Sequence, residues 1–182
     1  MEPKSSLKLG ELTTNQRGGK VFPASAQAWQ FQEWTRILWH PSPYGSEEAR
    51  RISLCLEPNE AAVADLKALE EDVKRQLTRR SLDDAKIFGR HLAASDVEAR
   101  FVSCLKTSAR GNSFIKLKVD LSRVNFWDAE QQPLEEPGNL AGRECKLRAE
   151  LKQVWLMSGQ CGLLVEVTDL MLKEELPRQC PF

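Results

Sequence analysis

The C-terminal third of the chain alternates apolar and polar residues along two segments. Residues 113–120 alternate apolar Ile115, Leu117 and Val119 with polar side chains, and residues 144–152 repeat the pattern. A period of two places every second side chain on the same face of a β-strand. The pattern therefore predicts two strands, each with one face in a core and one face in solvent.

Further strands are expected on both sides of these two. Residues 158–160 are typical of a hairpin turn, and residues 162–172 form the returning strand. Earlier in the chain, residues 50–56 predict a strand, and residues 97–106 and 123–127 predict two more. Several short strands separated by turn signals indicate an all-β sheet or a small barrel.

One long helix is expected among these strands, over residues 60–80, and Asn59 can cap its first turn. Acidic residues come early in this segment and basic residues late, which suits the helix dipole. Its apolar residues recur at spacings of three and four and so share one face. Ser81, with Asp84 three residues later, predicts the cap of a second, short helix that ends near Gly89. The apolar stripe of the long helix consists of Val63, Leu66, Leu69, Val73 and Leu77.

Composition limits what such a chain can be. Its 182 residues are enough for one domain, and a hydrophobic fraction of 41% is enough for a core. We expect a flexible segment over residues 1–20, a single domain over 21–175 and a tail over 176–182. The formal net charge of +0 argues against a surface that is basic throughout. It is compatible with a local basic groove, because charges are screened beyond about 10 Å at 0.1 M salt.

The five cysteines form no CxxC pair, and no histidine is spaced to complete a zinc site. We therefore expect no metal, no cofactor and free thiols, which are typical of a reducing compartment. The sequence lacks both a secretory leader and a run of about 18 apolar residues that a membrane helix needs. These features predict an intracellular protein that is neither secreted nor bound to a membrane.

Cations and aromatic rings are the residues that point to a function. Binding of single-stranded nucleic acid without sequence preference uses cations for the phosphates and flat rings for the bases. Lys146 and Arg148 are two apart and share one strand face. Strict alternation puts Trp155 on the other face, so a β-bulge is needed to bring it beside them. The candidate nucleic-acid-binding residues are Arg50, Arg51, Lys116, Lys118, Lys146, Arg148, Lys152, Trp155, Tyr44 and Trp39, followed by Arg100, Lys106, Arg110, Trp34 and Trp127.

Four groups of residues, in a fixed order, carry a resemblance to a known family. They are Pro43-Tyr44-Gly45-x-Glu47-Glu48; a strand that runs into Pro58-Asn59 and the long helix; Ile115-Lys-Leu-Lys-Val-Asp120 with the later Phe126-Trp-Asp-Ala-Glu130; and Lys146-Leu-Arg148 followed by an aromatic residue, a hairpin and the closing run from Leu163 to Glu174. In this order and spacing, over roughly residues 40–175, the chain resembles the phage-type single-stranded DNA-binding proteins.

The resemblance implies a mainly β fold with one long helix, namely an OB-fold-like five-stranded barrel with the helix inserted between early strands. It implies a protein without enzymatic activity that coats single strands during DNA replication and recombination. The binding residues would be the cations of the strand over residues 144–152, an aromatic just past its end, and Arg50 or Arg51 before the first strand. Single-stranded DNA is the expected partner, with RNA and a homodimer left open.

The C-terminal end departs from the family pattern. Family members end in a long acidic tail with a terminal aromatic residue that docks replication proteins. Here only Glu174 and Glu175 supply acid, Arg178 opposes them, and Phe182 is the candidate partner-docking residue.

Two other functions remain open from the sequence. The first is a protein-interaction module that uses the aromatic segment over residues 29–44 and binds no nucleic acid, which the neutral charge balance favours. The second is a nuclease that uses scattered acidic residues. The sequence contains no paired carboxylates at the ends of adjacent strands, no Gly-rich phosphate loop and no HExxH motif, so the nuclease ranks last.

Overall fold

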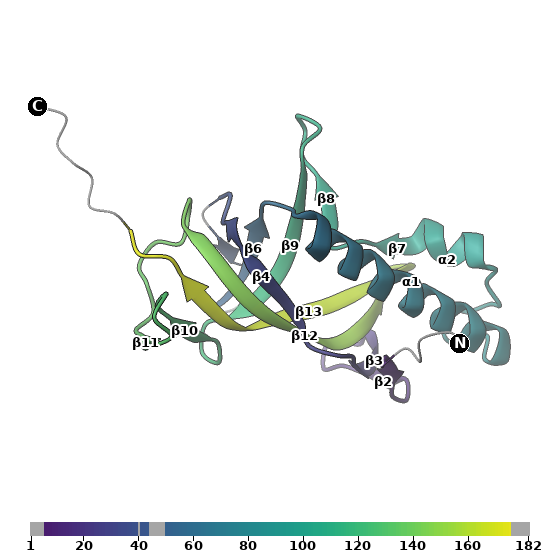
Figure 1. Ribbon diagram of the computed structural model, residues 1–182. Coiled ribbons are helices and arrows are strands. Elements are labelled where there is room, and N and C mark those ends of the chain that lie inside the picture. Colours follow the sequence, from purple (N-terminus) through teal and green to yellow (C-terminus); the bar gives the residue numbers. More distant parts are fainter. Residues whose placement is uncertain (1–5, 40, 44–49, 176–182) are drawn as a thin grey trace, which may run out of the picture.

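The computed structural model describes residues 6–39, 41–43 and 50–175. The fold is mainly β, with one long helix and one short helix (Figure 1). The helices are α1 (Glu60–Asp83) and α2 (Ala94–Arg100). The strands are β1 (Lys8–Leu9), β2 (Thr13–Thr14), β3 (Lys20–Ser25), β4 (Trp29–Arg36), β5 (Ser42–Pro43), β6 (Arg51–Leu56), β7 (Phe101–Val102), β8 (Leu105–Thr107), β9 (Ser113–Asp120), β10 (Asn125–Trp127), β11 (Pro133–Leu134), β12 (Glu144–Met157) and β13 (Gln160–Leu172).

The principal strands wrap into an OB-like barrel in the order β4–β12–β13–β9–β6. Neighbours are antiparallel except β13 and β9, which are parallel. A bridge between Ile37 and Leu56 links the end of β4 to β6, although no full ladder closes the sheet there. Helix α1 follows β6 and precedes β9, so it lies between the second and third barrel strands, and the β8–β9 hairpin projects away from the barrel (Figure 1). The predicted fold class is confirmed.

Helix α1 forms as the sequence pattern predicts and ends three residues later than expected. The Asn59 side chain caps it by accepting the backbone N–H of Ala62 at 2.8 Å. Leu66, Val73 and Leu77 of the predicted stripe are at most 1% exposed. The remaining two stripe residues are half-buried and pack against the same core.

The second helix predicted from Ser81 is wrong. Ser81 lies inside α1 and is fully buried, and its hydroxyl accepts the backbone N–H of Leu92 at 2.8 Å. The Ser81 hydroxyl therefore does not cap a helix but forms a tertiary hydrogen bond with the chain that follows α1. The short helix α2 begins instead at Ala94, and it occupies the first half of the strand that was expected over residues 97–106.

Strand β12 contains the β-bulge that the position of Trp155 required. The register with β13 shifts between Leu151 and Gln153. Beyond the shift the buried positions are even-numbered, as at Leu156, whereas before it they are odd-numbered. Trp155 therefore emerges on the same side of the sheet as Lys146.

The chain before β4 also belongs to the sheet. Strands β1 and β2, in the segment expected to be flexible, pair with β3, and β3 pairs with the second half of β12. Residues 29–36, for which we predicted no strand, form β4 on the first half of β12.

The cysteines that the structure describes are unpaired. Cys104, Cys145 and Cys161 are buried and Cys55 is half-buried, whereas Cys180 lies outside the described residues. Burial raises the pKa of Cys104 and of Cys145 to about 12, which keeps both thiols protonated. No helix among the described residues is both long and apolar enough to cross a membrane.

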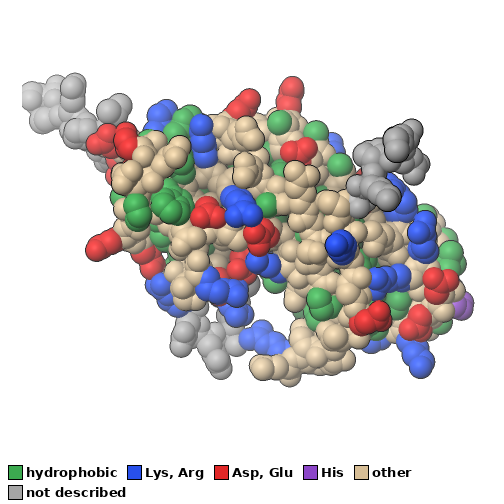
Figure 2. All heavy atoms as spheres, turned by 60° about the horizontal axis from the view of Figure 1, so that its bottom comes forward, with side chains coloured by type: hydrophobic (Ala, Val, Ile, Leu, Met, Phe, Trp, Pro, Cys, Tyr) green, Lys and Arg blue, Asp and Glu red, His purple; other side chains and the backbone are tan. Residues whose placement is uncertain are grey.

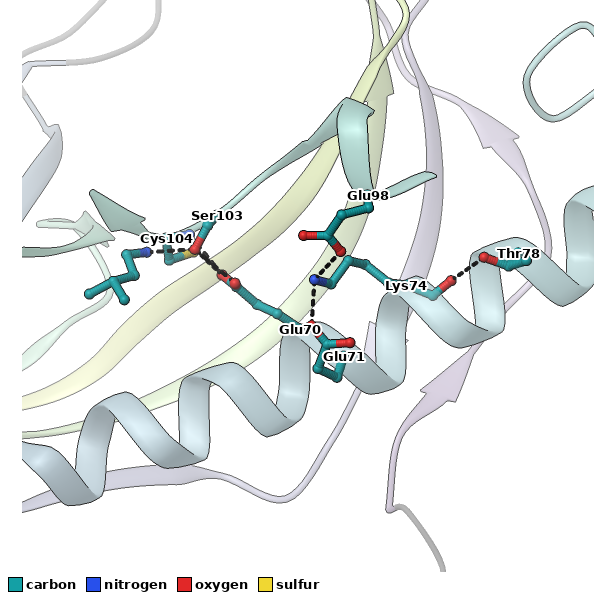
Figure 3. A network of polar contacts seen from close by, with 8 residues as sticks. Glu70, Glu71, Lys74, Thr78, Glu98, Ser103 and Cys104 are labelled. Atoms are coloured by element: carbon teal, nitrogen blue, oxygen red, sulfur yellow. Dashed lines mark hydrogen bonds and ion pairs between the residues drawn. The ribbon is translucent and has the colours of Figure 1, made fainter. Parts of the chain in front are cut away.

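A buried carboxylate fastens α1 to the segment that leads into β8 (Figure 3). Glu70 is 6% exposed, and its carboxylate accepts the Ser103 hydroxyl at 2.7 Å and the Cys104 backbone N–H at 2.8 Å. One turn later, Lys74 forms 2.5 Å ion pairs with Glu71 of the same helix and with Glu98 of α2. The helix thus fixes both α2 and the start of β8.

Glu70→Ala should lower the free energy of unfolding by about 1–3 kcal/mol, because it leaves the Cys104 N–H and the Ser103 hydroxyl buried without their partner. Urea denaturation measures the change. Glu71→Ala is the matched control on the same helix: Glu71 is exposed and Lys74 keeps its pair with Glu98, so its effect should stay within about 0.5 kcal/mol. Equal stability of the two variants would mean that the buried network contributes nothing.

Candidate nucleic-acid interface

Three lysines share the outer face of β8 and β9. Lys116 and Lys118 are two residues apart on β9, and their side chains point away from the core, because the residues between them are buried. Lys106 of β8 lies opposite Phe114, which is on the same face of β9. We call the surface formed by Lys106, Lys116 and Lys118 the lysine face.

Two cations of the lysine face, Lys106 and Lys116, have no carboxylate partner among the described residues. Lys118 is half-buried and donates to the Ser53 hydroxyl at 2.9 Å. Its pKa is lowered, first by burial and then by the positive charges of Lys116 and Lys106. In the part of the chain that the structure describes, no carboxylate lies within ion-pair distance of Lys106 or Lys116. The surface is therefore suited to an anion.

An exposed aromatic ring borders one end of the lysine face. Trp39 is 46% exposed, and its ring meets the Phe114 ring edge-to-face at a centroid distance of 4.8 Å. Because Phe114 lies on β9 two residues before Lys116, the ring pair adjoins the cations. This combination of rings and cations is the one that sequence-tolerant binding of single strands requires.

At the other end of the lysine face, the arginine side chains form ion pairs with carboxylates. Arg51 and Arg123 both pair with the buried carboxylate of Asp120, at 3.7 and 3.2 Å. Hydrogen bonds from Ser122 and then these guanidinium groups lower the pKa of Asp120. Arg50 pairs with Glu136 at 2.8 Å. Arg50 and Arg51, which were both expected binding residues, therefore already have carboxylate partners.

Lys146 and Arg148 line a separate hollow on the outer face of β4 and β12. The hollow has a volume of about 440 Å³, and its lining includes Trp34 and Met171; we call it the tryptophan hollow. The Lys146 ammonium lies 5.0 Å from the centre of the Trp34 ring, and the Lys173 ammonium lies 5.8 Å from it. The Trp34 ring and the two ammonium groups therefore already form cation–π contacts with each other.

Carboxylates lie in the tryptophan hollow, where Asp169 is part of the lining, and between the hollow and the lysine face, where Glu150 and Glu166 lie. Asp169 lies opposite Arg148, and Glu150 lies opposite Glu166, which in turn lies opposite Lys118. Glu150 also pairs with Arg148 at 3.3 Å and with Lys152 at 2.7 Å, and the hydrogen bond from Lys152 is the main cause of its lowered pKa. On the face drawn in Figure 2, basic and acidic side chains are likewise interspersed rather than separated.

Trp155 lies apart from both surfaces and is engaged in packing. Its ring covers Gly162 of β13, where an added Cβ atom would lie 2.5 Å from the ring. Its indole N–H donates to the Leu163 carbonyl at 3.3 Å. The bulge brings Trp155 to the expected side of the sheet, but the ring is half-buried there.

The sequence-predicted residues thus fall into groups. The structure brings Trp39, Lys116 and Lys118 together, and it places Lys146, Arg148 and Lys152 in a second group. Tyr44 and Phe182 lie outside the described residues. We missed Phe114, although its alternation with the two lysines of β9 was visible in the sequence. We also missed Lys173, which no local signal connects to Trp34.

No group of histidine, cysteine and acidic side chains in the described ranges could hold a metal ion. No protein-family model and no curated protein matches the sequence. Solved structures do match the fold. The single-stranded DNA-binding protein gp2.5 of bacteriophage T7 superposes with a TM-score of 0.54 at 13% identity, over 85% of this chain and 96% of gp2.5.

The fold resembles that of gp2.5. The single-stranded DNA-binding protein of bacteriophage Enc34 is also similar, with a TM-score of 0.46 at 12% identity over 96% of this chain and 94% of that protein. Its complex with single-stranded DNA gives a TM-score of 0.45 at 13% identity, over 94% of this chain and 99% of that one. The likeness to gp2.5 establishes the fold.

Gly162→Ala should lower the free energy of unfolding by about 1–3 kcal/mol, because the new methyl group collides with the Trp155 ring and lies 3.0 Å from the Val102 carbonyl oxygen. Thermal and urea denaturation measure the loss. Gly138→Ala is the control, since no atom lies within 4 Å of a Cβ added there. A Gly162→Ala protein as stable as the control would show that the Trp155 ring moves aside freely, and Trp155 would again be available for stacking.

Proposed function

We propose that this chain binds single-stranded DNA without sequence preference, and that it coats strands exposed during replication or recombination. The observation that carries the proposal is that Lys106 and Lys116 of the lysine face, which have no carboxylate partner in the described part of the chain, adjoin the exposed ring of Trp39. Phosphates would neutralise the cations and release counterions, and a base would stack on the ring. The proposed role is binding without chemistry, in a reducing intracellular compartment that suits the unpaired cysteines.

The position of the lysine face in the fold supports the same proposal. OB-folds bind oligonucleotides on their second and third strands and on the loops between strands one and two and between strands four and five. Here the second and third barrel strands are β6 and β9, and Trp39 lies in the loop between β4 and β6. The position of the β9 lysines on the third barrel strand therefore supports a binding surface at the lysine face.

We place the main contact on the lysine face rather than on Lys146 and Arg148. The cations of the tryptophan hollow already have an aromatic ring and carboxylates as partners. A DNA strand that used both surfaces would have to cross Glu150, Glu166 and Asp169. Lys146, Arg148 and Trp34 remain the proposed secondary contact.

The alternative of a protein-interaction module over residues 29–44 has less support. Trp29 and Phe31 belong to the core, and Trp34 is half-buried beside two lysines. Among the described residues of this segment, Trp39 is the large ring that stays exposed. A single exposed ring is a small surface for a protein partner and is sufficient for one base.

Lys106→Gln/Lys116→Gln should weaken binding to oligo(dT), measured by fluorescence anisotropy over a range of salt concentrations. The slope of log affinity against log salt should become shallower by about 1.4, because each phosphate contact on a single strand contributes about 0.7. Neither lysine has an ion pair with another described residue, so the folded state should be unaffected, which circular dichroism checks.

Lys146→Gln/Arg148→Gln is the matched comparison, since it removes the same charge from the tryptophan hollow. It should change the slope less than the lysine-face pair does. A slope change in this pair alone would move the site to the tryptophan hollow. No binding by the parent protein at low salt would refute the proposed function and favour the interaction module.

A further inference from the structure

A third hollow, formed by three turns at the far end of β12, is basic, and no carboxylate lines it among the residues that the structure describes. The turn between β2 and β3, the chain after α1 and the turn between β12 and β13 enclose about 430 Å³. Its lining includes Arg17, Lys20 and Arg100 but neither aspartate nor glutamate. We call it the three-turn hollow. None of its residues belongs to the lysine face or to the tryptophan hollow.

Backbone carbonyls hold two of these cations in position without neutralising them. The Lys20 ammonium donates to the Lys86 carbonyl at 2.7 Å, and the Arg100 guanidinium donates to the Gly159 carbonyl at 2.8 Å. An ammonium has three N–H donors and a guanidinium has five, so each cation keeps donors beyond these bonds. A carbonyl oxygen carries no net charge, and therefore the positive charge of the hollow persists.

The same hollow offers an apolar surface beside the cations. Met157 lines it and is 60% exposed, which is unusual for so large an apolar side chain in this protein. The half-buried ring of Phe88 lines it from the chain after α1. Thioethers and aromatic rings both pack favourably against flat rings. Cations next to such a surface match a ligand that joins a phosphate to a planar base.

We infer that the three-turn hollow binds a phosphate-bearing nucleotide unit, with the phosphate on Lys20 and Arg100 and the base against Met157 and Phe88. The unit is either a free nucleotide or one nucleotide of a longer strand. In the second case the inference rests on the proposed function, and the strand reaches a part of the molecule that the lysine face does not include.

The test uses thymidine 5′-monophosphate and thymidine as probes, followed by NMR on the isotope-labelled full chain. The monophosphate should shift the backbone amide resonances of Gly89, Ser158 and Gly159, and thymidine should shift them much less. Lys20→Gln/Arg100→Gln should weaken monophosphate binding by at least about tenfold, or about 1.4 kcal/mol. Glutamine removes the positive charge and keeps a polar side chain with N–H donors, and circular dichroism checks that the variant remains folded.

Arg79→Gln/Arg90→Gln is the control, because it removes two exposed positive charges outside the hollow. This pair should leave monophosphate binding unchanged. Equal weakening in both pairs would indicate an effect of overall charge and would overturn the assignment. Absence of monophosphate-dependent shifts at Gly89, Ser158 and Gly159 would overturn it as well, unless oligo(dT) binding gives a change in the salt slope.

Oligo(dT) strands of increasing length distinguish the two sources of the nucleotide. If a bound strand reaches the hollow, Lys20→Gln/Arg100→Gln makes the salt slope shallower for long strands and leaves it unchanged for short ones. If the slope stays unchanged at every length while the monophosphate binds, the ligand is a free nucleotide. If neither probe responds, the inference is wrong, whereas the lysine-face variants still test the proposed function independently.

Discussion

Three like charges on one face of β8 and β9 repel one another, and the fold nevertheless holds them together. The lowered pKa of Lys118 records both its burial and this repulsion. A folded-state pKa below the unfolded value means that the charged form is less stable in the folded protein. The resulting loss of stability is present at neutral pH, decreases as the pH rises above the folded-state pKa of Lys118, and is gone above its higher unfolded-state pKa. A bound polyanion would offset the repulsive part of this penalty at neutral pH, and perturbed titrating groups of this kind cluster at functional sites.

The rest of the fold keeps this charged face in place. The residues between the lysines of β9 lie in the barrel core, so the strand cannot turn its lysines away from one another without exposing that core. Glu70 of α1 holds the chain at Ser103 and Cys104, just before β8, which fixes the strand that carries Lys106 (Figure 3). The position of the lysine face therefore depends both on the barrel core and on the contact that Glu70 of α1 makes before β8.

Patterns within single elements allowed much of the fold to be predicted. Period-two alternation identified β9, β12 and β13, and the apolar stripe with its Asn59 cap identified α1. Contacts between distant segments account for the errors. Ser81 has the spacing of a helix cap but binds the backbone of Leu92. The register between β4 and β12 shifts between Cys145 and Leu147, and this irregularity lies in the strand that we missed.

The sequence predicted most of the candidate binding residues, but it did not predict which of them lie together in the folded protein. Alternation placed Lys116 with Lys118 and Lys146 with Arg148, because that relation is local. The carboxylates that separate the two pairs come from β12 and β13 in register, and the engagement of Trp155 depends on Gly162 of the next strand. Neither relation is encoded within one segment.

The most direct test is to identify the ring on which a bound base stacks. A single strand of oligo(dT) with bromouracil at defined positions forms covalent bonds on irradiation with aromatic side chains in contact with it, and mass spectrometry of the digested complex locates them. Cross-links at Trp39, next to the lysine face, are the predicted result. Cross-links confined to Trp34 or Trp155 would contradict the assignment of the lysine face as the binding surface.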